Sequence, residues 1–124
     1  MNTKPPECWS VDPHAHGLRV ELSPSHSFFL PYEHFVYAEL KSQDQSDVLT
    51  MVFATHEVVL RGQRFRRVEA AIQYRELASV NTVPQKYQSL IADNQPVIAG
   101  LTVRVVSNEP ASGDDATEWS SDES

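Results

Sequence analysis

Residues 49–77 constrain the fold more than any other stretch, because hydrophobic period, turn residues and helix pattern agree there. Residues 48–54 are almost all apolar or β-branched, which predicts a strand buried on both faces near the centre of a sheet. A polar turn at residues 55–57 and a second apolar run complete a hairpin. Gly62 then permits the backbone to turn into a helix. The stretch therefore predicts a hairpin that leads into an α-helix.

That helix is expected over residues 63–76. On a helical wheel of about 100° per residue, Phe65, Val68 and Ile72 fall in one narrow arc and should be buried. The pattern that follows predicts a strand at residues 77–83, a short helix at 85–92 and a long alternating strand at 97–106.

The first half of the chain adds fewer signals. Alternating apolar residues predict a strand at 18–22 that stops at Pro24, and another at 34–40. The polar run at 41–47 predicts a loop. We therefore predict an α+β fold, a single small domain with an antiparallel or mixed sheet of about five or six strands and one principal helix packed on one face. This domain should span residues 14–106, between a disordered N-terminal segment at 1–13 and a disordered acidic tail at 107–124.

The charge of the chain is concentrated at its C-terminus. Residues 108–124 hold six acids and no base, whereas the net charge of the whole chain is −7. Without those six, the remaining acids nearly balance the ten basic residues. A nearly neutral body argues against broad phosphate binding, which needs several clustered Lys or Arg side chains.

Cysteine content and hydropathy predict where the protein resides. The single Cys8 has no partner for an internal disulfide, and we expect an inert thiol there. The N-terminus has no apolar signal-peptide core, and no run reaches the roughly 18 apolar residues of a membrane span. We therefore expect a cytoplasmic protein without a membrane partner.

Five of the ten basic residues lie within residues 61–75. Such a cluster on a helix flank, next to a helix N-terminus, is a candidate site for an anion or a charged partner. The alternative is a solvated helix flank with no ligand. The candidate residues are Arg61, Arg64, Arg67 and Arg75.

Aromatic residues crowd into residues 28–37. They can form a stacking platform or peptide groove, or they can supply the core of a small domain. In the acidic tail, a lone tryptophan among carboxylates is typical of a docking motif for a basic groove, and equally of a solubilising end. The candidate interaction surface comprises Phe28, Phe29, Tyr32, Tyr37 and Trp119.

His14, His16 and Glu21 have the spacing H-x-H-x4-E. This spacing resembles the first ligand motif of the cupins, in which two histidines and a glutamate bind a divalent transition metal inside a β-barrel. The glycines of that motif would fall at Cys8 and Phe28, and the second motif is absent. We therefore predict that these three residues hold no metal.

We predict a small non-enzymatic interaction or adaptor module that self-associates as a homo-oligomer and binds a protein partner. It should carry no catalytic residue and no cofactor. The first alternative is a nucleic-acid-associated regulator that uses the arginine flank. The second is a metal-binding protein or enzyme that uses His14, His16 and Glu21.

Overall fold

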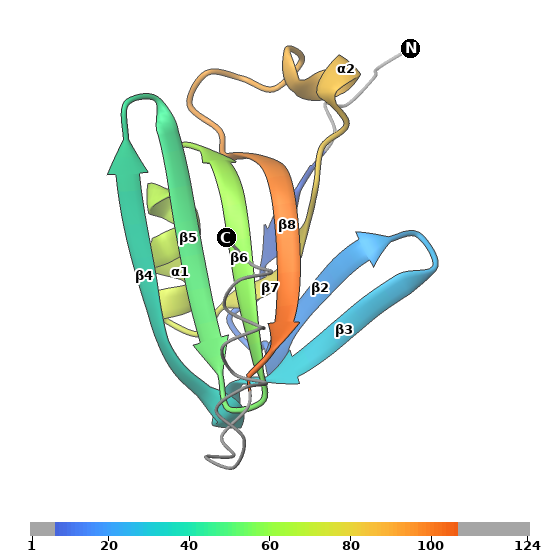
Figure 1. Cartoon of the computed structure of the whole chain (residues 1–124), viewed down its shortest axis with the longest axis vertical. Coiled ribbons are helices and arrows are strands. Elements are labelled where there is room, and N and C mark those ends of the chain that lie inside the picture. The colour runs from blue at the N-terminus through green and yellow to red at the C-terminus, as the bar shows by residue number, and fades with distance from the viewer. Residues whose placement is uncertain (1–6, 107–124) are drawn as a thin grey trace, which may run out of the picture.

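The computed structural model describes residues 7–106, which form two four-stranded β-sheets and one principal helix (Figure 1). The first sheet has the strand order β1-β7-β2-β3 and the second the order β4-β5-β6-β8. The strands of the first sheet are β1 (Trp9–Val11), β2 (Gly17–Ser23), β3 (His26–Pro31) and β7 (Leu77–Asn81). Those of the second are β4 (Phe35–Gln43), β5 (Ser46–Phe53), β6 (His56–Gln63) and β8 (Val97–Val105). The short 3-10 helix η1 (Tyr32–His34) joins the sheets, α1 (Arg66–Gln73) connects β6 to β7, and α2 (Gln85–Gln88) precedes β8.

The hydrophobic core lies between the two sheets and α1. In Figure 1, α1 lies behind β4 and β5, and β7 lies behind the β6–β8 half of the second sheet. The second sheet is an antiparallel meander closed by β8, and its inner face supplies the fully buried Leu49, Met51 and Leu60. In the first sheet, β7 pairs in parallel with β2 and antiparallel with β1. No helix within residues 7–106 has the length and apolar character needed to cross a membrane.

The expected α+β class is confirmed, but the expected single sheet of five or six strands is wrong. Two strands were not predicted. The aromatic residues 26–31 form β3, a hairpin partner of β2, so Pro24 lies in a turn and does not end the sheet. β1 forms within the segment predicted to be disordered, and Cys8 before it is buried. The acidic tail lies outside the described residues.

The predicted loop at residues 41–47 is mostly strand. β4 runs to Gln43 and β5 starts at Ser46, which leaves a two-residue turn. Asp44 occupies the left-handed region with φ 57°, a conformation that aspartate tolerates better than most residues. Four of the polar residues on either side, at positions 41, 42, 43 and 46, are exposed strand positions, so polarity alone overestimated the loop.

β5 lies inside its sheet, between β4 and β6, as predicted. Its expected burial on both faces is wrong. Leu49, Met51 and Phe53 are buried, whereas the alternate residues Val48 and Val52 are half-buried. The outer face of the second sheet is thus only partly covered.

The predicted apolar stripe of the principal helix is confirmed, since Phe65, Val68 and Ile72 are all fully buried. The helix itself is shorter than expected, because β6 continues to Gln63 and the chain turns at Arg64 with φ 61°.

Gly62 has a different role from the one predicted. Its φ is not positive, so it supplies no special turn. Instead, a Cβ atom at this position would lie 1.8 Å from the carbonyl oxygen of Val97 and 2.9 Å from the Phe65 ring. The glycine therefore allows β6 and β8 to approach closely at the irregularity in their pairing, next to the start of α1.

Candidate binding site

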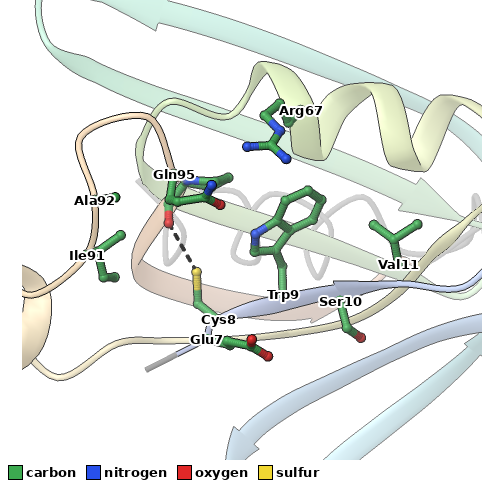
Figure 2. Close-up of a pocket in the computed structure, with 10 residues that line it drawn as sticks. Glu7, Cys8, Trp9, Ser10, Val11, Arg67, Ile91, Ala92 and Gln95 are labelled. Atoms are coloured by element: carbon green, nitrogen blue, oxygen red, sulfur yellow. Dashed lines mark hydrogen bonds between the residues drawn. The ribbon is translucent and has the colours of Figure 1, made fainter. Parts of the chain in front are cut away.

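A hollow of about 490 Å³ opens between β1, the N-terminal turn of α1 and the loop that leads into β8 (Figure 2). One wall consists of residues 7–11, which are β1 and the two residues before it. The opposite wall is formed by Ile91, Ala92, Gln95 and Pro96. β1 is an edge strand of its sheet, so a ligand in the hollow lies alongside a strand whose outer edge pairs with no strand of residues 7–106.

Trp9 and Arg67 form the centre of the hollow. The guanidinium carbon of Arg67 lies 5.7 Å from the centroid of the Trp9 ring, and Figure 2 shows the charged group above the indole. Trp9 is half-buried and packs against the core, whereas Arg67 is exposed. Within residues 7–106, Arg67 makes no ion pair with an acid. Its charge thus remains available to a ligand that lies on the indole.

Cys8 closes the inner end of the hollow. Its side chain is 1% exposed, and its Sγ donates a hydrogen bond to the carbonyl oxygen of Pro96 at 3.5 Å. Burial raises the pKa of the Cys8 thiol above its ordinary value, so the group stays protonated at neutral pH. A thiol is a poor nucleophile. Cys8 therefore joins β1 to the loop before β8 and gives the hollow an apolar end.

The structure divides the four candidate arginines among three places. Arg64 Nε donates to the Gln95 carbonyl oxygen at 2.8 Å, and Gln95 and Arg67 both line the hollow. Arg75 follows α1 at its other end, with its guanidinium carbon 5.8 Å from the centroid of the Phe35 ring. Arg61 is exposed on β6. The four residues do not form one continuous flank.

The N-terminus of α1 already holds an internal carboxylate. Asp47 Oδ2, from β5, accepts a hydrogen bond at 2.9 Å from the backbone N–H of Phe65, the N-cap residue. A carboxylate at a helix N-terminus satisfies a free N–H and complements the helix dipole. The place where the sequence suggested an external anion is thus filled by Asp47.

The aromatic candidates do not form one surface. Tyr32 is 6% exposed, and its hydroxyl donates to the Leu77 carbonyl oxygen at 2.5 Å, so its assignment to a surface is wrong. Phe28 is half-buried between His26 and His56, with ring centroids 5.2 and 5.3 Å away. Phe29 and Tyr37 are 59% and 53% exposed, but they belong to different sheets. Trp119 lies outside the described residues.

His14, His16 and Glu21 are not brought together as metal ligands. Both histidines are exposed before β2, and the Glu21 carboxylate lies 3.2 Å from Arg19 Nε. In residues 7–106, no group of three or more His, Cys, Asp or Glu side chains could hold a metal ion.

Comparison of the chain with models of protein families, with curated proteins and with solved structures found no match. The hollow itself was not predicted, since Cys8 and Trp9 were assigned to a disordered segment. One local signal was present, because Cys8, Trp9 and Val11 are three apolar residues within four positions of an otherwise polar segment.

Proposed function

We propose that this protein is a non-enzymatic interaction module that binds an acidic peptide carrying an apolar anchor residue. The observation that carries the proposal is Arg67, an exposed cation without an ion pair in residues 7–106, held above Trp9 beside a hollow of about 490 Å³. An apolar side chain can fill the hollow against Trp9 while a neighbouring carboxylate binds the guanidinium. Aromatic and arginine side chains of this kind dominate the energetics of peptide recognition.

The edge position of β1 supports an extended peptide as the ligand. The Cys8 carbonyl oxygen accepts a hydrogen bond from the Asn81 N–H at 2.8 Å, so the main chain of Cys8 faces β7. By the alternation of an antiparallel pair, the N–H and C=O of Trp9 point to the opposite side of β1. An added strand uses such main-chain groups for affinity and the adjacent hollow for specificity.

Binding to a short synthetic peptide tests this function. The probe is a fluorescently labelled glutamate-rich peptide with one central leucine, measured by anisotropy against the full chain at low salt. We expect Arg67→Ala to weaken binding by about tenfold or more, since a hydrogen bond to a charged group contributes about 1.5–3 kcal/mol. Arg75→Ala is the matched control at the other end of α1 and should leave the affinity unchanged. Glu7→Gln, at the wall of the hollow, should strengthen binding because it removes a like charge.

Two results would overturn the proposal. The first is equal binding of the peptide by the wild-type chain and the Arg67→Ala variant. The second is absence of peptide binding together with retention of a single-stranded oligonucleotide whose affinity falls steeply with salt, which would favour the nucleic-acid alternative.

A second proposed property is self-association through β8. This strand has nine residues, forms an edge of the second sheet and carries a single charge, Arg104, which pairs with Glu57. The Val106 N–H donates to the Thr55 carbonyl oxygen at 2.8 Å, so alternation directs the main-chain groups of Val105 away from β6. A long edge strand of low charge is a template for pairing with a second copy.

Sedimentation over a range of concentrations measures this association. Val105 is 61% exposed, and Val105→Lys places a charge on the β8 edge. We expect this variant to be monomeric where the wild-type chain dimerises. Val36 on β4 is similarly exposed at 59%, and Val36→Lys should still dimerise. A wild-type chain that stays monomeric at all concentrations, or an equal effect of both lysines, would contradict pairing through β8.

A further inference from the structure

We infer that the acidic segment at residues 108–124 of this chain occupies the Trp9 hollow and competes there with the external peptide. The inference rests on the proposed function, because it names a second occupant of the same site and thereby a way in which binding is regulated.

Charge complementarity supports this occupant. The segment holds six acids and no base, whereas the rest of the chain is nearly neutral. Arg67 lines the hollow and makes no ion pair with an acid within residues 7–106. An available cation on a nearly neutral body therefore complements a segment that carries only negative charge.

The side chains of the segment match the two groups that the hollow offers, a cation and an aromatic ring. Glu118 and Trp119 are adjacent, so one carboxylate and one large apolar ring arrive together. The hollow offers the Arg67 guanidinium and the Trp9 indole in the same adjacent arrangement. Aromatic pairs contribute about 0.5–1.5 kcal/mol beyond the area that they bury.

The length of the chain permits the contact. The hollow lies beside Pro96, immediately before β8, whereas residues 108–124 follow the other end of that strand. Nine strand residues span about 30 Å. The twelve residues that follow Val106, up to and including Glu118, reach about 40 Å when extended. A segment tethered at this span has an effective concentration of about the millimolar range, so a weak contact is enough to compete with a peptide in solution.

Paramagnetic broadening in the full chain tests the inference. A spin label on Ser121→Cys reports on the contact, because the buried Cys8 thiol reacts slowly and the label goes to the introduced cysteine. At low salt we expect broadening of the Trp9 indole N–H signal and of the Gln95 amide. High salt should restore both signals, since exposed ion pairs are screened.

Matched variants decide the site of contact. Glu118→Gln combined with Trp119→Ala changes no residue within 7–106 and should abolish the broadening, as should Arg67→Gln. Arg75→Gln should leave the broadening intact. Broadening that persists in the Arg67→Gln variant, or that is confined to residues near Val105, would overturn the inference.

The same sample separates this inference from the proposed function. If the peptide and residues 108–124 compete for the hollow, addition of the glutamate-rich peptide should restore the Trp9 indole signal. If the peptide shifts that signal but the label never broadens it, the inference is wrong and the proposed function stands. If the label broadens it but the peptide neither shifts nor restores it, the proposed function is wrong.

Discussion

The Asp47 carboxylate accepts the backbone N–H of Phe65 at 2.9 Å, and this hydrogen bond joins the start of β5 to the start of α1. Asp47 therefore supplies, from a distant strand, a carboxylate that caps the N–H of the N-cap residue. Asp47→Ala should lower the free energy of unfolding by about 1 kcal/mol, the usual effect of losing a cap. Asp44→Asn removes a neighbouring charge but keeps a residue that tolerates positive φ, and it should change stability by less than about 0.5 kcal/mol. Urea denaturation measures both values, and equal losses would exclude a capping role for Asp47.

Gly62 on β6 and Gly100 on β8 can be compared directly, because both lie where these two strands pair. A Cβ atom at Gly62 would lie 1.8 Å from the Val97 carbonyl oxygen, whereas one at Gly100 would meet only Arg61 Cβ at an ordinary 3.6 Å. Gly62→Ala should cost about 3 kcal/mol or more, since the backbone has to shift. Gly100→Ala should be nearly neutral. Thermal unfolding of the two variants checks this expectation. A Gly62→Ala protein as stable as the wild type would show that Gly62 and the Val97 carbonyl group do not lie so close together.

Arg75 occupies the left-handed position after α1, with φ 58°, where glycine is common. The Glu76 N–H donates to the Ala71 carbonyl oxygen at 2.8 Å and the Arg75 N–H to that of Ile72 at 3.0 Å, which is a Schellman motif. Arg75→Ala keeps the backbone strain and loses the contact with Phe35. Arg75→Gly loses the contact but removes the strain, and it should be about 1 kcal/mol more stable than Arg75→Ala. Chemical denaturation that ranks the alanine variant above the glycine variant would contradict the assigned backbone conformation.

The buried Cys8 thiol predicts a pH dependence of stability. Burial raises its pKa above the ordinary value of 9.0, so the folded chain retains a proton that the unfolded chain releases. The stabilisation by Cys8 is therefore complete below pH 9.0 and is lost as the pH rises through the folded pKa. Between pH 8 and 10 the wild-type melting temperature should fall more than that of Cys8→Ala. Parallel melting curves across this range would show that the thiol titrates alike in both states.

The sequence was informative where the structure is local. The stripe of Phe65, Val68 and Ile72 was predictable because helical periodicity requires only neighbouring residues. β1 has three residues and depends on β7, as in the contact between the Ser10 and Ser79 hydroxyls at 2.6 Å. A strand specified by a partner about seventy positions away leaves little local periodicity, so the two-sheet architecture could not be predicted.

The candidate site, too, could be predicted only where it depends on residues that are close in sequence. The candidate arginines lie within fifteen residues, and we predicted a cluster on a helix flank because we expected a helix over residues 63–76. The backbone instead turns at Arg64, and this turn separates Arg61 on β6 from Arg67 in α1. At the other end, α1 stops at Gln73, so Arg75 lies beyond the helix. The pairing of Arg67 with Trp9 joins residues that are remote in sequence, and only the fold brings them together.

We propose that the hollow between Trp9 and Arg67 binds an acidic peptide. Chemical-shift mapping of the isotope-labelled full chain, titrated with the glutamate-rich peptide, tests it most directly. We predict that the Trp9 indole N–H and the Gln95 amide move most, and that Arg67→Ala suppresses both shifts while Arg75→Ala does not. Shifts centred on β3, on the β8 edge or around Arg75, with the Trp9 indole signal unmoved, would contradict the claim.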